Sequence, residues 1–284
     1  HRGGLSEPCR RRRRLAVSGS SLVEVAADAA RAGGDLIERY WRKLPGDSVS
    51  EKRANDFVTR ADKESEEVIV ARIRDRYPED GFLGEEGGRR GAGGERRTWI
   101  IDPLDGTSNF IAGFPFWSVS VAARERGEIV AGAIWDPLRR ELYSAERGSG
   151  AFRDGERLKV TARENLDGAF LATGFPFRAK DRIDLYLSIF RELFLHARAI
   201  RRAGSAALDL AQVAAGVFDG FFEFKLSVWD IAAGALLIEE AGGRICDFDG
   251  GSGYWERGNV VAGAPGVAGG IVKVASGLFS DLEI

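Results

Sequence analysis

The order of strand-like and helix-like segments limits the folds that this chain of 284 residues can adopt. From Trp99 to about residue 157, short apolar runs of strand character follow one another and are separated by turn residues. Beyond residue 160, strand-like and helix-like segments alternate. Two earlier helices are predicted, one behind the capping box Ser21-x-x-Glu24 and one over about residues 60–77. This order indicates a layered α/β protein.

The chain is predicted to consist of an arm and two lobes that share one catalytic unit. Residues 1–19 are polar and arginine-rich and are expected to form a disordered arm. Residues 20–160 would form an N-terminal α+β lobe with the metal-binding motifs, and residues 161–284 a C-terminal α/β lobe that completes the active site. Within the first lobe, SEKRANDFVTRAD is interpreted as a turn-rich link and GGRRGAGGERR as a mobile loop.

Composition excludes several classes of protein. A net charge of −2 gives no general attraction to nucleic acid or to an anionic membrane. No apolar run approaches the roughly 20 residues that cross a bilayer. Two cysteines cannot build a disulfide framework and are typical of a reducing cytoplasm, where we expect the protein to be found. Two histidines leave little material for a Ser/His/Asp triad or a zinc site.

The stretch TWIIDPLDGTSNF, residues 98–110, carries the first chemical signal. An apolar run that predicts a buried strand stops at Asp102 and Asp105, where Pro103 and Gly106 supply turn geometry. Two carboxylates about 4 Å apart repel by roughly 4 kcal/mol at an effective dielectric of about 20, so one holds a proton or a cation lies between them. Oxygen ligands alone favour Mg²⁺ over Zn²⁺. The alternative is an ordinary turn, because Asp-Pro and Asp-Gly are common turn dipeptides.

Acids elsewhere in the chain favour the metal interpretation. Glu85 and Glu86 follow the short apolar stretch FLG, and Asp230 opens the apolar helix DIAAGALLIEEAG. Taken alone, an Asp at a helix start is more often a cap than a ligand. A Trp-Asp-x-Ala-Ala-Gly start is more particular, because small residues let the helix pack closely and hold Asp230 rigidly.

These segments together resemble the inositol monophosphatase family. GEE, IDPLDGTSNF and WDIAAGALLIEEAGG occur in the order and spacing of its signature motifs, and the similarity extends from about Ser21 to the C-terminus. The resemblance implies a layered α/β/α/β/α sandwich of the inositol monophosphatase / fructose-1,6-bisphosphatase type, usually a homodimer. It also implies a lithium-sensitive phosphatase that uses Mg²⁺, with two or three ions in each active site.

The resemblance implies a role for each matching residue. The metal ligands would be Glu85, Asp102, the main-chain oxygen of Leu104, Asp105 and Asp230, and the side chain of Leu104 should matter little. Residues that contact substrate would be Asp105, Gly106, Thr107, Gly204, Ser205, Glu223 and Asp230, of which Gly106 and Thr107 resemble a phosphate-binding turn. Supporting residues behind the metals would be Asp62, Lys52 and Glu86.

The implied reaction is the hydrolysis of inositol 1-phosphate by a water that Glu85 and Thr107 orient, with no covalent phospho-enzyme. Asp105 is counted among the catalytic residues. Within the same family, fructose 1,6-bisphosphate, histidinol phosphate or a nucleotide remain alternative substrates. An alternative of another class is a regulatory protein that retains the fold and contacts the transcription machinery. In that case the arginines Arg10 to Arg14 could touch nucleic acid or polymerase, which we favour less because every expected metal ligand is present.

Overall fold

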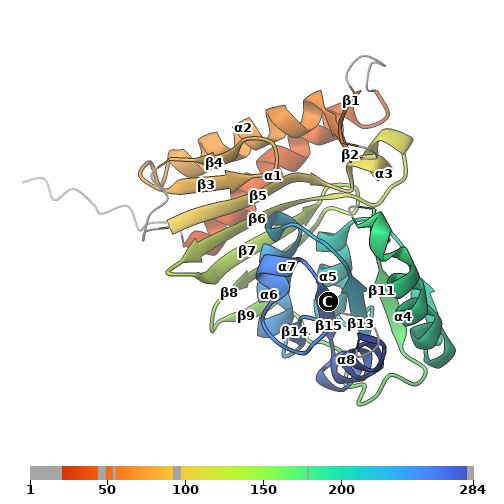
Figure 1. Ribbon diagram of the computed structural model, residues 1–284. Helices are drawn as coiled ribbons and strands as arrows, with labels where there is room; N and C mark the ends of the chain where they lie inside the picture. The colour runs from red at the N-terminus through yellow and green to blue at the C-terminus, as the bar shows by residue number, and fades with distance from the viewer. Residues whose placement is uncertain (1–20, 44–48, 54–55, 92–96, 178, 280–284) are drawn as a thin grey trace, which may run out of the picture.

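The computed structural model describes residues 21–43, 49–53, 56–91, 97–177 and 179–279. Five layers stack in the order helix, sheet, helix, sheet, helix, as the sequence predicts (Figure 1). The predicted arm, residues 1–19, lies outside the described residues. No helix within the described ranges is long and apolar enough to cross a membrane.

Two helices form the first layer. α1 (Leu22–Tyr40) begins at the predicted capping box, in which Ser21 N donates to Glu24 Oε2 at 2.9 Å. α2 (Arg60–Arg74) ends three residues earlier than predicted. Both helices pack on one face of the large sheet, where Trp99, Ile101 and Val119 belong to the buried core.

The second layer is an eight-stranded sheet of order β10-β9-β8-β7-β6-β5-β3-β4. All neighbours are antiparallel except β3 and β5, which run parallel. The parallel pair therefore places the carboxyl ends of β3 and β5 at the same edge. The strands are β3 (Gly81–Gly84), β4 (Gly88–Arg90), β5 (Arg97–Asp105), β6 (Ser118–Glu125), β7 (Glu128–Asp136), β8 (Glu141–Glu146), β9 (Gly150–Arg153) and β10 (Glu156–Arg157).

The remaining layers come from the second half of the chain. α5 (Ala206–Ala214) and α6 (Val228–Glu240) lie between the two sheets, and their apolar residues form the largest core. The second sheet has the order β12-β11-β13-β15-β14, and α4 (Ile183–His196) and α8 (Pro265–Phe279) cover its outer face. Its strands are β11 (Phe170–Thr173), β12 (Ala199–Arg201), β13 (Gly220–Glu223), β14 (Arg244–Cys246) and β15 (Val260–Gly263).

Two loop predictions for the first lobe were wrong in part. The segment interpreted as a turn-rich link forms the hairpin of β1 (Val49–Arg53) and β2 (Asp56–Thr59). The glycine- and arginine-rich segment contributes β4, which pairs with β3. At these positions the strands form through their backbone hydrogen bonds, although the sequence offers few apolar side chains to bury. The short helices are α3 (Thr107–Ala112), η2 (Lys180–Arg182) and α7 (Tyr254–Arg257).

Candidate active site

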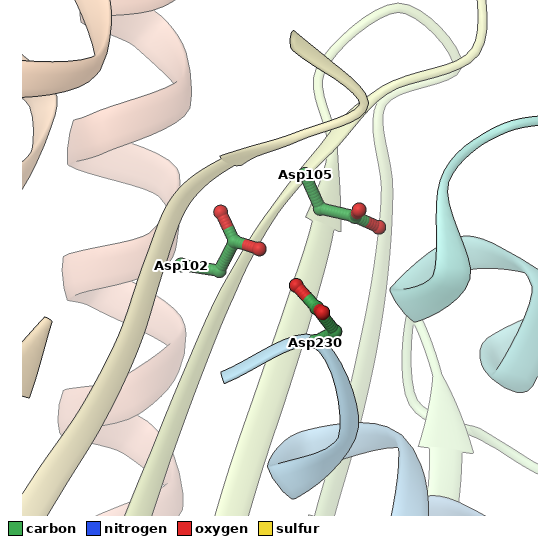
Figure 2. A group of neighbouring side chains, drawn as sticks. All are labelled: Asp102, Asp105 and Asp230. Carbon is green, nitrogen blue, oxygen red and sulfur yellow. The ribbon is translucent and has the colours of Figure 1, made fainter. Parts of the chain in front are cut away.

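A β-bulge at the end of β5 brings Asp102 and Asp105 to the same face of the sheet. In a regular strand, residues three positions apart point to opposite faces. Asp102 pairs with Ser120 and Asp105 with Ser118, so three steps along β5 match only two along β6. Pro103 lies inside this bulge, where the ladder does not need its missing N–H. Figure 2 shows both carboxylates near that of Asp230, which lies at the start of α6.

The bulge also determines where Leu104 lies. Its side chain is 1% exposed and packs in the core beneath α1 and α2, on the face opposite to the two acids. The expectation that this side chain should matter little is therefore wrong for stability, because a polar residue here would be buried in an apolar core. Its carbonyl oxygen accepts a hydrogen bond from Thr107 Oγ1 at 3.0 Å.

Asp230 joins the two acids from the far side of the site. It is the third residue of α6, and its Oδ2 accepts the N–H of Ser227 at 2.6 Å, which completes a capping box. The expectation that Asp230 begins the helix is corrected, because Ser227 is the N-cap and Asp230 caps it in return from the first turn, while its carboxylate also belongs to the cluster. Asp102, Asp105 and Asp230 each offer one carboxylate oxygen, and these three atoms lie within 4.8 Å of one another (Figure 2). The three residues are at most 9% exposed.

Burial and the charges of neighbouring acids raise the pKa values of Asp102 and Asp105. The pKa of Asp102 lies well above its ordinary value, first because the group is buried and then because of the charges of Glu85, Asp105 and Asp230. Burial and then the charge of Asp230 raise the pKa of Asp105 from 3.8 to about 7, against opposing hydrogen bonds. A cation among the carboxylates would favour their ionised forms.

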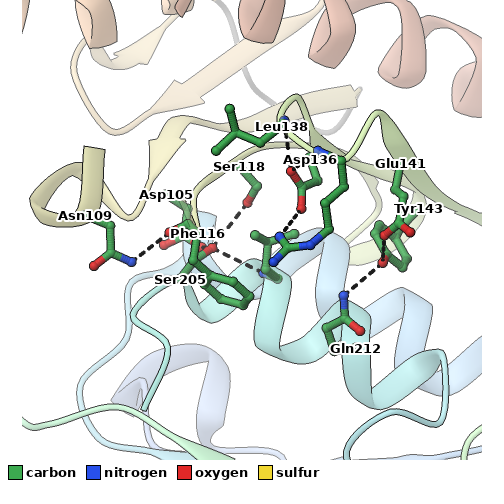
Figure 3. Close-up of polar contacts among 12 residues, drawn as sticks. Asp105, Asn109, Phe116, Ser118, Asp136, Leu138, Glu141, Tyr143, Ser205 and Gln212 are labelled. Carbon is green, nitrogen blue, oxygen red and sulfur yellow. Dashed lines mark hydrogen bonds and ion pairs between the residues drawn. The ribbon is translucent and has the colours of Figure 1, made fainter. Parts of the chain in front are cut away.

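Asp105 is held in place by the start of α5. Its Oδ2 accepts hydrogen bonds from Ser205 Oγ at 2.5 Å and from the N–H of Ala207 at 2.8 Å. Nearby, Asn109 Nδ2 donates to the carbonyl oxygen of Phe116 at 2.7 Å (Figure 3). The same nitrogen also donates to the carbonyl oxygen of Ala203 at 2.9 Å. Asn109 thereby joins α3 to the turn before α5, so two distant segments are fixed around one carboxylate.

Glu85 enters the site from β3. It follows the last residue of that strand, and its N–H donates to Ile101 O at 3.2 Å, which continues the parallel pairing with β5. The carboxyl ends of the parallel strands β3 and β5 therefore deliver Glu85 and Asp102 to one place. Glu85 lies close enough that its charge raises the pKa of Asp102.

Gly106 and Thr107 form the turn beyond the acids. Gly106 has a φ of 93°, and a Cβ there would lie 3.0 Å from Phe116 O, so glycine is the residue that fits. Thr107 Oγ1 lies 3.0 Å from Leu104 O and 3.2 Å from Asp62 Oδ1, and both of these are acceptors. Its single hydrogen is therefore directed to the protein, and its lone pairs are left to accept a hydrogen bond.

The predicted residues line one cavity of about 570 Å³. Those in its wall are Glu85, Asp102, Leu104, Asp105, Gly106, Thr107, Gly204, Glu223 and Asp230. Ser205 is 1% exposed and contacts Asp105 from behind, and Asp62 is 1% exposed below Thr107. Glu86 lies on the turn after Glu85, and Lys52 belongs to β1, whose side chains are outside the description.

Several residues of this cavity were not named individually among the predicted site residues. Phe175 and Phe177 line it, and the guanidinium of Arg202 lies over both rings, at 5.3 Å and 5.1 Å from their centroids. Asn109 was also missed, although an amide directly after the DPLDGTS motif was the available signal. Aromatic residues in a loop carry no comparable signal, because they are as often core as site.

The donor set fits a hard divalent cation. Every candidate ligand at the cluster is an oxygen, and the ion pairs formed among the described residues include neither Asp102 nor Asp105. Buried carboxylates are stable when they are paired or when they coordinate a metal. The raised pKa values show that the protein groups around these two acids do not provide that compensation.

This arrangement of five layers around a cavity with an acidic floor corresponds to a known class. A model of the inositol monophosphatase family matches residues 19–277, so the chain belongs to that family.

Three individual relatives match this chain over most of its length. The chain is 49% identical over 246 residues to the Nus factor SuhB of Pseudomonas aeruginosa, an alignment that covers 85% of this chain and 91% of the relative. The structure resembles the extragenic suppressor protein SuhB of Bartonella henselae with a TM-score of 0.85 and 39% identity, over 90% of this chain and 98% of that one. It also resembles an IMPase of Thermotoga maritima, with a TM-score of 0.82 and 34% identity, over 91% and 98% of the two chains.

Proposed function

We propose that the protein is a Mg²⁺-dependent phosphomonoesterase that hydrolyses inositol monophosphate, with phosphate and the free polyol as products. The observation that supports this most strongly is the cluster of Asp102, Asp105 and Asp230 on the floor of a cavity large enough for such a substrate. Membership of the inositol monophosphatase family supports phosphatase chemistry in general.

The metal ligands in this proposal are Glu85, Asp102, Asp105, Asp230 and the carbonyl oxygen of Leu104. When bound, two or three Mg²⁺ ions would neutralise the phosphoryl oxygens, lower the pKa of a water and stabilise the leaving alkoxide. The bulge in β5, the capping box of α6 and the end of β3 fix the backbone around these residues, which supports their assignment as ligands.

The attacking water would be held by Glu85 and Thr107. The Thr107 hydroxyl directs its hydrogen to Leu104 O or Asp62 Oδ1, so its oxygen accepts a hydrogen from the water and aims the water's lone pair at phosphorus. The Glu85 carboxylate would accept the other hydrogen. Because Glu85 and Thr107 would together orient a water, direct attack by that water, without a covalent phospho-enzyme, is the mechanism we propose.

The substrate would lie between Gly106 and Glu223. The N–H groups at Gly106 and Thr107 would face the phosphate, since Gly106 lets the main chain approach closely. Glu223, at the end of β13, and Gly204, before α5, would contact the hydroxyls of the polyol. Ser205 and Asp62 would support the site through Asp105 and Thr107, and Glu86 and Lys52 would do so from the turn after β3 and from β1.

A substrate panel tests this proposal. Phosphate release would be measured with and without Mg²⁺ on inositol 1-phosphate, fructose 1,6-bisphosphate, histidinol phosphate and nucleotide phosphates. We expect Mg²⁺-dependent release with the highest kcat/KM on inositol 1-phosphate. A higher kcat/KM on another ester would reassign the substrate within the family, and no release from any of them would contradict the enzyme proposal.

A second candidate is a role in transcription. The relative that is 49% identical to this chain is named a Nus factor, which supports contact with the transcription machinery. To test whether the arginine arm takes part in this role, residues 1–17 would be deleted and binding to RNA and RNA polymerase measured. Lost binding with intact phosphatase activity would make this a second role.

We also propose that the protein is a homodimer and is cytoplasmic. Sedimentation would test the oligomeric state, and cell fractionation would test the location.

A further inference from the structure

Three buried polar residues of α2 lie directly beneath the site. Asp62, Ser65 and Glu66 are each at most 1% exposed, and their spacing of three and four residues places them on one face of the helix. Asp62 contacts Thr107, as described above, and Ser65 Oγ donates to Pro103 O at 3.3 Å. Glu66 reaches a third segment of the site, the turn that carries Glu85.

Glu66 binds the main chain of that turn. Its Oε2 accepts the N–H of Glu86 at 2.8 Å. On the other side of the turn, the N–H of Glu85 donates to Ile101 O in β5. The backbone of Glu85 is therefore held between strand β5 and a side chain of α2.

The sequence around Gly84 accommodates this contact. A Cβ on Gly84 would lie 2.3 Å from Glu66 Oε2, so any side chain there would displace the carboxylate or the strand end. The glycine in FLGEE is thus required by close approach. Arg90, on β4, provides the counter-charge, because its NH2 lies 3.1 Å from Glu66 Oε1 and its Nε donates to Gly87 O at 3.3 Å.

We infer that Glu66 is a positioning residue that fixes the direction of Glu85 toward the cation cluster and thereby sets the affinity of the site for Mg²⁺. This inference rests on the proposed function, in which Glu85 is a metal ligand. Groups that orient metal ligands are worth about 10- to 100-fold in metal affinity. The N–H of Glu86 and the charge of Arg90 oppose the increase in the pKa of Glu66 that burial causes.

The test compares three substitutions in the full chain. Glu66→Gln keeps the shape of the side chain but introduces an amide NH₂ group. The N–H of Glu86 and the guanidinium of Arg90 are both donors and require acceptors at this position. Arg90→Gln removes the counter-charge and leaves the Glu66 acceptor in place. Glu67→Gln is the matched control, because Glu67 is the adjacent acid on the same helix and is exposed.

Mg²⁺ binding to each metal-free variant is measured by isothermal titration calorimetry, and circular dichroism confirms that each is folded. We expect Glu66→Gln to weaken Mg²⁺ binding about 10-fold and Arg90→Gln to weaken it about threefold, with Glu67→Gln unchanged. The Mg²⁺ concentration for half-maximal activity should rise by the same factors, whereas kcat at saturating Mg²⁺ should stay within about twofold. If Glu66 only stabilised the fold, Glu66→Gln would instead lower kcat and the melting temperature, with no specific change in Mg²⁺ affinity.

The possible failures are distinguishable. Glu66→Gln that is folded and binds Mg²⁺ as tightly as the wild type overturns the inference. If Glu66→Gln does not fold, wild-type affinity in Arg90→Gln overturns it instead. Wild-type protein that binds Mg²⁺ but hydrolyses no phosphate ester overturns the proposed function alone, and wild-type protein that binds no Mg²⁺ overturns both.

Discussion

Two groups of buried acids in this molecule are stabilised differently. Asp136 is 1% exposed, and it accepts hydrogen bonds from the N–H groups of Leu138 and Arg139 and from the Arg139 guanidinium at 2.7 Å. Asp219 is 6% exposed and accepts from Thr161, Arg163 and Phe170 N at 2.7 to 3.1 Å.

Asp102 and Asp105 are buried as deeply, but other carboxylates surround them. The charges of Glu85, Asp105 and Asp230 raise the pKa of Asp102, where a base would have lowered it. This difference in neighbours distinguishes buried acids that stabilise the fold from buried acids that we expect to bind a cation. An acid that the chain pairs with a base stabilises its neighbours, whereas an acid buried among other carboxylates is ionised only at a cost, which a cation among them would remove.

The largest expected effect is on turnover. Asp105→Asn should lower kcat by about 10²- to 10³-fold, because it removes a negative charge that would stabilise the bound cations. The fold should survive, since the amide oxygen can still accept from Ser205 and Ala207. Steady-state phosphate release measures the loss, and Asp28→Asn, at an exposed acid on α1, is the control. Near-wild-type turnover in Asp105→Asn would refute the role of this residue.

Mg²⁺ itself should stabilise the protein. At about 100 times its Kd, a ligand that binds only the folded state adds about 2.7 kcal/mol, which corresponds to an increase in Tm of roughly 5 °C or more for a chain of this size. Differential scanning calorimetry with and without MgCl₂ measures this increase, with KCl of equal ionic strength as the control. An unchanged Tm at saturating Mg²⁺ would contradict a shared metal site.

Substitution of a structural acid, in contrast, should lower the stability of the protein and leave its Mg²⁺ affinity unchanged. Asp136→Asn weakens a buried acceptor of three hydrogen bonds and should lower the free energy of unfolding by about 1–3 kcal/mol. Its Mg²⁺ affinity should match that of the wild type, because Asp136 belongs to the paired group. Urea denaturation and calorimetric Mg²⁺ titration check the two halves of this prediction. A large change in Mg²⁺ affinity would break the distinction between the groups.

The last effect concerns pH and is small at each step of one pH unit. The folded-state pKa of Asp105 is raised from 3.8 to about 7, so its contribution to stability in metal-free protein is fully present below about pH 4 and is lost as pH rises through about 7. The loss should be on the order of 1 kcal/mol per pH unit between about pH 5 and 7. The Tm gained from Mg²⁺ should therefore grow over this range. A gain that shrinks with rising pH would have the wrong sign.

The sequence predicted the residues of the site better than the reason they meet. The motifs of GEE, DPLDGT and WD indicated which acids converge, and the structure places Asp102, Asp105 and Asp230 together. The bulge that turns Asp105 to the face of Asp102 depends on pairing with β6 and could not be read from local spacing. For the same reason the burial of Leu104 was missed.

The supporting contacts were the least predictable part. Ser205 was expected to meet substrate, yet its hydroxyl lies behind Asp105, a relation between residues 100 positions apart. Glu66 had a weak signal, because it follows Asp62 by four residues on one helix face, but its partner in the turn after β3, the N–H of Glu86, is set by tertiary packing alone. Local pattern predicts the faces of helices and strands, whereas contacts across layers need the fold itself.

The most direct test of the central claim is a crystal structure of the protein soaked in MnCl₂, with anomalous scattering used to locate the ions. Mn²⁺ accepts the same oxygen ligands as Mg²⁺ and is visible at its absorption edge. The account predicts an anomalous peak among the carboxylate oxygens of Asp102, Asp105 and Asp230, at coordination distance from each. Ions found only on surface acids, with none at this cluster, would contradict it.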